Sequence, residues 1–279
     1  YAAMLSGVSL LMPDRFLQPE PLTDMIEQVR PTFGAGVPTI WNGLLQYQEA
    51  TGRDISSLRQ LLSGGSACPP DLIKAYQTKG ITVLQGWGMT ETSPVSTQNR
   101  TDDTFEQKVG TVGFVGPHLE IKIIDPVTGE TQPRGKSGEF LTKGYSVMLG
   151  YWNQDDKTAE AIEDGWMHTG DIGVMDDDGY VQISGRTKDM VIRGGENIYP
   201  REIEEFLYTH PDIVDAQVIG VPDQKWGQAV TAVVHAVPGA RMDEAAVRAH
   251  VRDALAGYKT PKAIVVTDRP LRAPNGKAD

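Results

Sequence analysis

The sequence predicts three kinds of structure in succession: an α/β region, an antiparallel sheet or barrel, and a small α+β region. Up to about residue 99, short apolar runs alternate with helix-length stretches, which is the pattern of a mostly parallel sheet covered by helices. From 100 to 187 the apolar segments become short and alternating, and turn residues separate them. From 188 onward two helical stretches and three apolar runs predict a small α+β unit.

Local patterns place the elements of the α/β region. Leu22, Met25, Ile26 and Val29 lie at positions i, i+3, i+4 and i+7 of one helical face, so a helix is expected over Pro19–Val29. Apolar runs bounded by Gly and Pro give the remaining elements. The expected strands are Val8–Met12, Thr32–Gly36, Leu58–Leu62 and Ile81–Leu84, and the expected helices are Pro38–Ala50 and Pro69–Thr78.

The later regions are predicted in the same way. Asp176-Asp177-Asp178-Gly179 predicts a hairpin, because Asp-Gly supplies the positive-φ positions of tight turns. The antiparallel strands are expected at Glu120–Ile124, Gly138–Thr142, Ile172–Met175 and Val181–Ser184. The α+β unit is expected to hold helices at Pro200–Tyr208 and Met242–Ala256, with strands at Ala216–Val221, Ala229–Ala236 and Ala263–Thr267.

Composition narrows the class of protein. With 26 Lys and Arg against 37 Asp and Glu, the net charge is −11 and the pI is near 4.9, which argues against binding to a nucleic-acid backbone. Cys68 is the single cysteine, so no internal disulfide can form and a cytoplasmic location is expected. Every apolar stretch is shorter than the roughly 20 residues that span a bilayer. Peripheral membrane contact and oligomer formation stay open.

Two glycine-containing turns follow predicted strands. Ser63-Gly64-Gly65-Ser66-Ala67 opens a helix, and such turns let the backbone approach a flat or anionic ligand closely. Gly86-Trp87-Gly88-Met89-Thr90-Glu91 follows the strand at Ile81–Leu84, at the carboxyl end where open α/β sheets bind ligands. Trp can stack on a base, Thr can donate to a phosphate, and Glu can hold a hard cation. The alternative for the first turn is a plain strand-to-helix connection, and for the second it is a buried Trp followed by an exposed Thr-Glu helix start.

The second turn resembles the aromatic-Gly-x-Thr-Glu signature of the adenylate-forming superfamily, which contains acyl-CoA synthetases, luciferases and peptide-synthetase adenylation domains. The resemblance implies that Trp87 packs on adenine, Thr90 contacts phosphate, and Glu91 ligates Mg²⁺. Gly64, Gly65, Ser66 and Ala67 match the adenine-binding turn of the family, and Gly86 belongs to the same nucleotide site.

Further motifs follow in the family's order. Gly165-Trp166-Met167-His168-Thr169-Gly170-Asp171 resembles the block whose aspartate holds the ribose, so the resemblance assigns that role to Asp171 and a structural role to His168. The run from Gly185 to Pro200 resembles the hinge and following loop of acyl-CoA synthetases. It implies ribose or phosphate binding by Arg186, a domain pivot at Lys188, and passage of the pantetheine arm of CoA past Gly194 and Gly195.

Near the end of the chain, Pro274-Asn275-Gly276-Lys277 resembles the family's lysine motif, with Asn275 where Ser or Thr is more usual. The resemblance makes Lys277 catalytic, stabilising charge on the carboxylate and the phosphate. The block from Gly138 to Asn153 resembles a further family motif and is assigned no catalytic role.

Together these resemblances imply an ATP-dependent ligase that forms an acyl-adenylate and then an acyl-CoA, with ATP, Mg²⁺ and CoA as cofactors and a carboxylic acid as the other small-molecule substrate. Gly88 lies where the family places an acyl-pocket residue. Together with Val37 as an apolar lining residue, it favours a medium- or long-chain fatty acid. An aryl-CoA ligase, an acyl-AMP ligase that feeds a carrier protein, and a degenerate half-protein that binds only nucleotide or a partner are the alternatives.

The resemblance also predicts the domain organisation. Residues 1–187 are expected to be the C-terminal part of a large adenylate-forming domain, with an α/β layer at 1–99 and a β-barrel-like part at 100–187. Residues 188–279 are expected to be the small mobile C-terminal domain. The family's Ser/Thr/Gly-rich phosphate loop is absent from residues 1–279. We therefore expect poor adenylation by this chain alone. Truncation is expected at both ends, because the opening apolar run Tyr1–Pro13 is typical of mid-domain core and the chain ends at Asp279 without a helix cap or strand to close its last element.

Overall fold

The computed structural model describes residues 6–237, 239–240 and 242–271. The chain forms two compact units. The first contains residues up to Leu119 together with the short segments Gly144–Leu149 and Asp178–Val181. The second contains the intervening segments and everything from Gln182 onward, so the domain boundary predicted at 188 lies inside it and stays a prediction.

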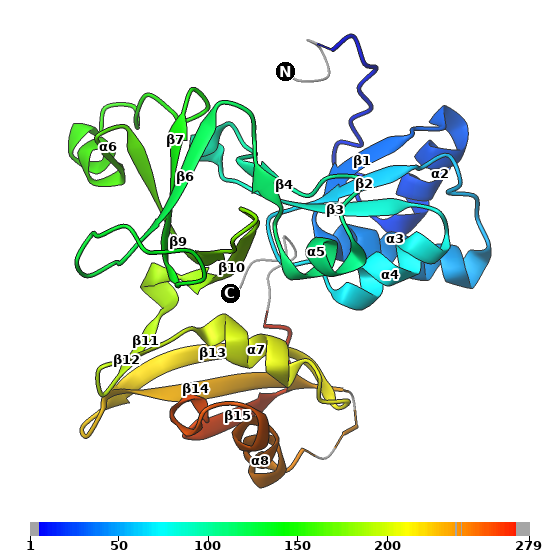
Figure 1. Ribbon diagram of the computed structural model, residues 1–279. Coiled ribbons are helices and arrows are strands. Elements are labelled where there is room, and N and C mark those ends of the chain that lie inside the picture. Colours follow the sequence, from blue (N-terminus) through cyan, green and yellow to red (C-terminus); the bar gives the residue numbers. More distant parts are fainter. Residues whose placement is uncertain (1–5, 238, 241, 272–279) are drawn as a thin grey trace. The chain divides into compact units, whose positions relative to one another are not determined.

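The first unit is built on a five-stranded sheet with the order β1-β2-β3-β4-β5 (Figure 1). The first three strands are parallel, and β4 and β5 continue the sheet in antiparallel pairing. The strands are β1 (Phe33–Gly36), β2 (Gln60–Ser63), β3 (Thr82–Trp87), β4 (Thr97–Gln98) and β5 (Phe114–Val115). The helices are α2 (Pro19–Val29), α3 (Pro38–Thr51), α4 (Pro70–Thr78) and α5 (Phe105–Gly110), with the 3₁₀ turn η1 (Thr90–Thr92).

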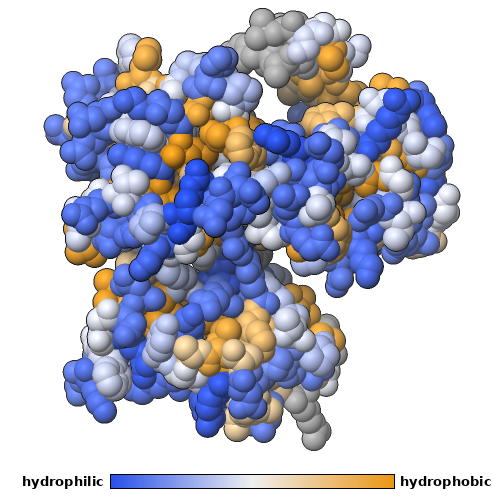
Figure 2. All heavy atoms as spheres, viewed as in Figure 1, coloured by the Kyte–Doolittle hydropathy of each residue, from blue (hydrophilic) through white to orange (hydrophobic). Residues whose placement is uncertain are grey.

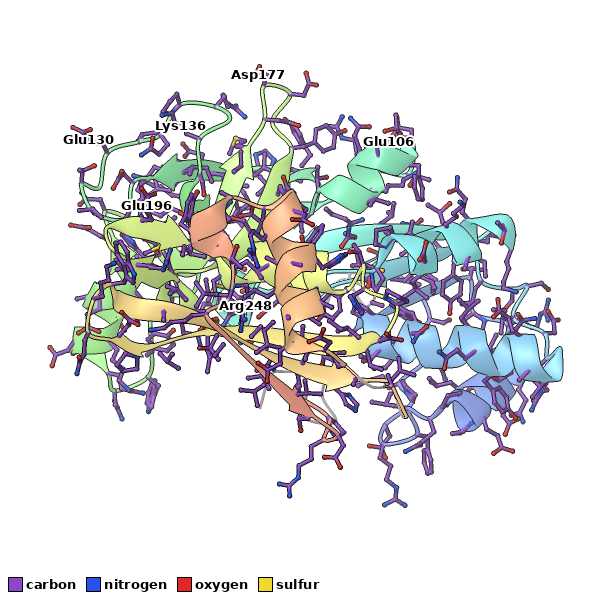
Figure 3. The ribbon with its side chains drawn as sticks, turned by 90° about the horizontal axis from the view of Figure 1, so that it is seen from below. Glu106, Glu130, Lys136, Asp177, Glu196 and Arg248 are labelled. Atoms are coloured by element: carbon purple, nitrogen blue, oxygen red, sulfur yellow. The ribbon has the colours of Figure 1, made fainter. Side chains whose placement is uncertain are left out.

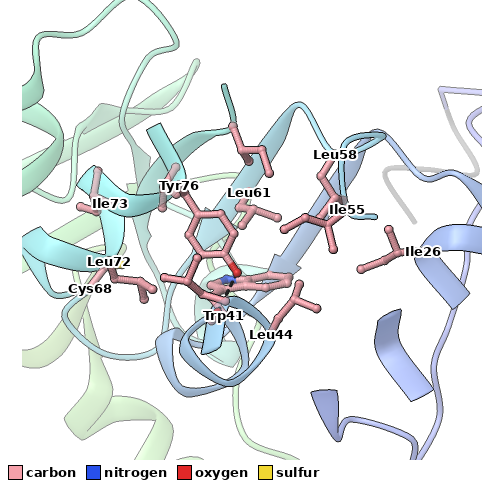
Figure 4. Close-up of a cluster of buried hydrophobic side chains, with 13 residues drawn as sticks. Ile26, Trp41, Leu44, Ile55, Leu58, Leu61, Cys68, Leu72, Ile73 and Tyr76 are labelled. Atoms are coloured by element: carbon pink, nitrogen blue, oxygen red, sulfur yellow. Dashed lines mark hydrogen bonds between the residues drawn. The ribbon is translucent and has the colours of Figure 1, made fainter. Parts of the chain in front are cut away.

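Proline fixes where three of these helices begin. It occupies the first turn of α2, α3 and α4, where its missing N–H costs no hydrogen bond. The helices then bury one face in an apolar core that includes Trp41, Leu61 and Tyr76 (Figure 4). The Tyr76 hydroxyl donates to the carbonyl of Trp41 at 2.6 Å, so the buried phenol is paired. Each large apolar side chain buried in this way stabilises the layer by about 1.5–3 kcal/mol.

One predicted element of this unit is wrong. No strand forms at Val8–Met12. Val8 is 61 % exposed and Met12 is 74 % exposed, and the described sheet begins at β1. An apolar run becomes a strand only when another strand offers it hydrogen bonds, and no described strand pairs with this one. The short elements β4, β5 and α5 were not predicted.

The second unit contains a curled sheet with the order β10-β9-β7-β6, and β8 pairs with β9. The members are β6 (Leu119–Ile124), β7 (Gly138–Gly144), β8 (Ile162–Glu163), β9 (Trp166–Met175) and β10 (Val181–Arg186), with helix α6 (Asp155–Ala161). The turn between β9 and β10 is the predicted hairpin, and Figure 3 shows Asp177 at its tip.

The same unit contains a second sheet. Its order is β12-β11-β14-β13, and β15 pairs in parallel with β14. The strands are β11 (Val191–Arg193), β12 (Glu196–Ile198), β13 (Ile213–Asp223), β14 (Gly227–Ala236) and β15 (Ala263–Thr267), and the helices are α7 (Pro200–Leu207) and α8 (Glu244–Ala254). Two further 3₁₀ turns are η2 (Thr187–Asp189) and η3 (Gly257–Lys259). Ile203, Val218, Val234 and Val251 are among the side chains that form its core.

The predicted helices and strands of these later regions are present. Most ends shift by at most three residues, whereas β9 begins at Trp166, six residues before the strand predicted at Ile172–Met175. No helix among the described residues is long and apolar enough to cross a membrane. The face shown in Figure 2 is largely hydrophilic, with smaller hydrophobic areas between the polar residues.

Candidate functional site

The glycine turn after β2 lies beside the end of β3. Gly64 donates its N–H to the carbonyl of Gly36 at 3.2 Å, which ties the turn to β1. A Cβ on Gly64 would lie 3.2 Å from the carbonyl oxygen of Gly86, so the turn and β3 approach closely. The structure therefore brings the two predicted nucleotide-binding segments of the first unit together, at the carboxyl ends of neighbouring parallel strands.

The turn is fixed at its far end by a buried amide. Gln85 accepts the backbone N–H of Cys68 at 3.0 Å and donates to the carbonyl of Lys108 at 2.7 Å. Cys68 is buried, and this burial raises the pKa of its thiol to about 11. The thiol is therefore un-ionised at neutral pH and is not a nucleophile. Ser66 and Ala67 are exposed on the turn.

Trp87, Thr90 and Glu91 differ in exposure. Trp87 is 8 % exposed, so most of its indole packs inside the first unit and only a small part is open to a base. Thr90 is exposed and Glu91 is half-buried in η1. The carbonyl of Glu91 accepts the N–H of Met148 at 2.8 Å, which anchors η1 to a distant segment of the chain.

The structure shows which groups lie next to Val37 and Gly88, the two residues predicted to line an acyl pocket. The side chain of Val37 lies 3.4 Å from the position that a Cβ on Gly65 would occupy, so Val37 borders the glycine turn. A Cβ on Gly88 would lie 1.6 Å from the carbonyl oxygen of Pro94. The backbone of this loop therefore requires glycine at 88, independently of any acyl group. The pocket role of Gly88 stays a prediction.

A cavity of about 730 Å³ opens in the first unit next to these residues. Leu84, Val95 and Phe114 contribute apolar wall, and Val95 lies 3.8 Å from the Cβ position of Gly86. The guanidinium of Arg100 stacks 4.5 Å from the centre of the Phe114 ring. Sequence reasoning did not select these residues, because a short strand pair in a loop region carries no motif of its own.

The two ribose candidates meet in the second unit. Asp171 is on β9 and Arg186 ends β10, and the Nε of Arg186 lies 3.0 Å from Oδ1 of Asp171. The Asp171 side chain is 9 % exposed and that of Arg186 is 58 % exposed. The nearly buried carboxylate can accept hydrogen bonds from hydroxyls, and the exposed guanidinium beside it can donate to a phosphate.

The hinge candidate and the glycine loop lie further along the chain. Lys188 is exposed within η2. Gly194 and Gly195 form the turn between β11 and β12, and the N–H of Gly194 donates to the carbonyl of Trp226 at 2.9 Å. A Cβ on Gly194 would lie 2.7 Å from the indole of Trp226, so the ring packs directly on the glycine.

Trp226 is a candidate that sequence reasoning missed. Its side chain is 39 % exposed, and the charged groups of Arg193 and Lys225 lie 5.1 and 4.8 Å from its ring. An exposed indole flanked by cations can bind a nucleotide: the ring stacks on the base, and the cations pair with the phosphates. The sequence signal was a Trp between Lys and Gly in a loop after a strand.

Two predicted groups need separate comment. Lys277 lies outside the described residues. For Mg²⁺, no group of three or more His, Cys, Asp or Glu within the described part of the chain is arranged to hold a metal. The single carboxylate of Glu91 still fits this ion, because Mg²⁺ commonly binds through one or two carboxylates plus substrate phosphates.

The chain matches two family models in sequence. Residues 1–152 match the AMP-binding enzyme family, and residues 202–277 match the AMP-binding enzyme C-terminal domain. The chain therefore belongs to the AMP-binding enzyme family. This confirms the resemblance to acyl-CoA synthetases of the adenylate-forming superfamily.

Known relatives agree with this assignment. A feruloyl-CoA synthase from Amycolatopsis is 40 % identical over 98 % of this chain and 55 % of its own length. The medium-chain acyl-CoA ligase ACSF2 of Danio rerio is 41 % identical over 96 % of this chain and 45 % of its own length. The chain thus spans about half the length of the curated relatives that it matches.

The fold agrees as well. The o-succinylbenzoate CoA synthetase MenE of Bacillus subtilis, solved with its acyl-adenylate intermediate, superposes with a TM-score of 0.87 at 31 % identity. The match covers 99 % of this chain and 55 % of that chain. The predicted fold class, α/β and barrel-like parts of an adenylate-forming domain followed by a small α+β domain, is confirmed.

Proposed function

We propose that the protein carrying this chain is an AMP-forming acid–CoA ligase that acts most readily on a medium- or long-chain fatty acid. The observation that carries the proposal is the Asp171–Arg186 pair on neighbouring strands, whose carboxylate could accept from ribose hydroxyls and whose guanidinium could donate to a phosphate. The glycine turn beside the end of β3 supports it with a second nucleotide-binding segment. Membership of the AMP-binding enzyme family agrees with both.

In the first half-reaction a carboxylate oxygen attacks the α-phosphorus of ATP, and the bond to pyrophosphate breaks. Gly64–Ala67 and the exposed part of Trp87 hold the adenine, Asp171 holds the ribose, and Thr90 and Arg186 bind phosphate. Lys277 offsets the repulsion between the carboxylate and the α-phosphate. Mg²⁺ bound through Glu91 would neutralise the charge that develops on the departing pyrophosphate.

In the second half-reaction the sulfur of CoA attacks the acyl carbonyl, and AMP leaves. The small domain turns about Lys188 between the two steps, so that Lys277 is withdrawn and the Gly194–Gly195 loop reaches the acyl group. The contact of Gly194 with Trp226 supports CoA as the acceptor, since the ring and its two cations suit the nucleotide end of CoA.

The choice of acid rests on the first unit. The cavity next to Gly86 is lined by polar residues, including Asn99 and Arg100, and by apolar ones. Its apolar part, at Val95 and Phe114, suits a hydrocarbon chain or an aromatic ring, as does the position of Val37. The two relatives named above differ in this respect, one acting on a feruloyl group and the other on medium-chain acids. A fatty acid is the first choice, and an aryl acid is the second.

A panel of acids tests the proposal. The protein at its natural length is incubated with ATP, Mg²⁺, CoA and fatty acids of 6 to 16 carbons or aryl acids, and acyl-CoA and acyl-AMP are quantified by mass spectrometry. Fatty acyl-CoA as the main product is expected. Accumulation of acyl-AMP with CoA present would instead identify an acyl-AMP ligase. Absence of saturable binding to an acyl-AMP analogue would identify a degenerate binding protein.

The isolated 279-residue polypeptide is expected to release pyrophosphate far more slowly than the protein at its natural length, because the phosphate loop is absent from this sequence. Equal rates would contradict the proposal that the nucleotide site needs residues that this sequence does not contain. The cytoplasmic location, the peripheral membrane contact and an oligomeric state remain predictions.

A further inference from the structure

Asp171 lies in a β-bulge of β9, where three residues oppose one. Glu139 of β7 pairs with Ile172, and Leu141 pairs with His168. Between these two pairs β7 has one residue, Phe140, whereas β9 has three, Thr169, Gly170 and Asp171. Bulges of this kind interrupt the ladder and redirect side chains next to functional sites.

The extra residues need side-chain hydrogen bonds, because the ladder no longer pairs them. One oxygen of the Glu139 carboxylate accepts the N–H of Gly170 at 3.2 Å, and the other lies 3.2 Å from Nδ1 of His168. One carboxylate thus contacts both the residue before the bulge and its central glycine. Gly170 has a φ of 68°, in the left-handed region that favours glycine.

Thr169 completes the bulge. Its hydroxyl donates to the carbonyl of Phe140 at 2.5 Å and accepts the N–H of Asp171 at 3.1 Å. The backbone on both sides of Gly170 is therefore fixed, by Glu139 through the Gly170 N–H and by Thr169 through the Asp171 N–H. Asp171 then contacts Arg186 at 3.0 Å.

Glu139 differs from an ordinary surface carboxylate. Its side chain is 12 % exposed, whereas Glu163, the other carboxylate near His168, is 78 % exposed and lies 3.7 Å from Nε2. A nearly buried carboxylate is costly unless its oxygens are hydrogen-bonded, so its presence at this point requires the contacts that it makes. A charged acceptor also binds a backbone N–H more strongly than a neutral one.

We propose that Glu139 is a positioning residue for Asp171: by holding Gly170 and His168 it fixes the bulge that aims the Asp171 carboxylate at the ribose hydroxyls of the nucleotide. The inference rests on the proposed function, which assigns the ribose to Asp171. Glu139 acts through the backbone of the bulge, and its loss should weaken recognition of the ribose specifically.

The test measures discrimination between ATP and 2′,3′-dideoxy-ATP by the protein at its natural length, as the ratio of KM values for pyrophosphate release. The Glu139 variants are compared with three proteins: the wild type, Asp171→Ala and Glu163→Gln. Glu163→Gln is the matched control, because it alters the exposed partner of His168 and does not change the contact with Gly170. Wild type should prefer ATP by about 30-fold, because the analogue lacks the two hydroxyls that would donate to the charged Asp171 carboxylate. Asp171→Ala should abolish most of the preference.

Glu139→Gln keeps the shape and an acceptor but loses the charge, and should reduce the preference about threefold; Glu139→Ala should reduce it about tenfold. Glu163→Gln should match the wild type within about twofold. If Glu139→Ala does not fold, the isosteric Gln variant decides the matter.

The outcomes separate the two proposals. If the wild type prefers ATP, Asp171→Ala does not, and the Glu139 variants retain the full preference, the positioning role is wrong and the ribose role of Asp171 stands. A Glu139 variant that raises KM equally for both nucleotides has only a structural role, which also overturns the inference. If the wild type shows no preference, the ribose assignment itself fails, and the inference fails with it.

Discussion

The loop that follows β3 and the bulge in β9 both carry predicted nucleotide-binding residues, yet they are held in shape by different means. The loop is shaped by backbone contact, since Gly88 approaches the Pro94 carbonyl and Ser96 donates to the carbonyl of Trp87 at 2.9 Å. The bulge is shaped by the side chains of Glu139 and Thr169. The stability of the loop should therefore fall when a side chain is added at glycine. The stability of the bulge should fall when a hydrogen-bonding side-chain group is removed.

The largest effect is expected from Gly88→Ala. The new methyl group would lie 1.6 Å from a backbone oxygen, so the loop must move. We expect a loss of about 3 kcal/mol of unfolding free energy, measured by urea denaturation, together with weaker nucleotide binding. Gly110→Ala is the control, because a Cβ there meets nothing within 4 Å. Equal stability of the two variants would show that the loop is not held by its backbone.

Thr169→Val should have the next largest effect. The substitution removes the hydroxyl that pairs with Phe140 and Asp171, and leaves a carbonyl and an N–H of the bulge unsatisfied. We expect a loss of about 1–2 kcal/mol, again from urea denaturation.

Thr142→Val is the matched control for this change. Thr142 lies on β7, and its buried hydroxyl has no hydrogen-bond partner among the described residues. Its removal should be neutral or stabilising, since no hydrogen bond is lost. A similar loss in both variants would mean that the cost comes from the shape of valine and not from the hydrogen bonds of the bulge.

Acid should weaken the first unit through Glu27. The hydrogen bond from Arg53 is the main cause that lowers the pKa of Glu27 from 4.5 to about 2. Because the folded pKa lies below the unfolded one, this stabilisation is complete above about pH 4.5 and is lost as the pH falls toward 2. Hydrogen exchange of β3 amides between pH 5 and pH 2.5 should show the loss.

Glu27→Gln is the control for the acid effect. It should be less stable than the wild type at pH 7, and the difference should shrink as the pH approaches 2, because protonated Glu27 resembles Gln. A difference that does not change with pH would show that the carboxylate charge contributes nothing.

The smallest effect concerns Cys68, whose buried thiol reports on the glycine turn. With a pKa near 11 and little exposure, it should react with iodoacetamide at pH 8 many times more slowly than an exposed cysteine. Gly88→Ala should speed the reaction by loosening the neighbouring loop, whereas Thr169→Val should leave it unchanged. Equal acceleration in both variants would mean that the two regions open together.

The sequence alone located most of the helices and strands and the identity of the candidate residues. Two of these signals are local: proline in the first turn of α2, α3 and α4, and the regular spacing of apolar residues. Local signals can be recognised in the sequence without knowledge of tertiary contacts. The motifs around Trp87, Asp171 and Gly194 are local as well. The apolar run at Val8–Met12 shows the limit, because pattern cannot tell whether a strand has a partner.

Contacts between residues far apart in sequence were decided only by the tertiary structure. Glu139 reaches His168 and Gly170 because the pairing of β7 and β9 carries two extra residues on one side, and no local pattern records such a register. The contact of Trp226 with Gly194 likewise joins residues far apart in sequence, and no local pattern predicts it. The sequence thus identified Asp171 as the candidate for binding the ribose, and the strand pairing determined which side chains contact the backbone next to it.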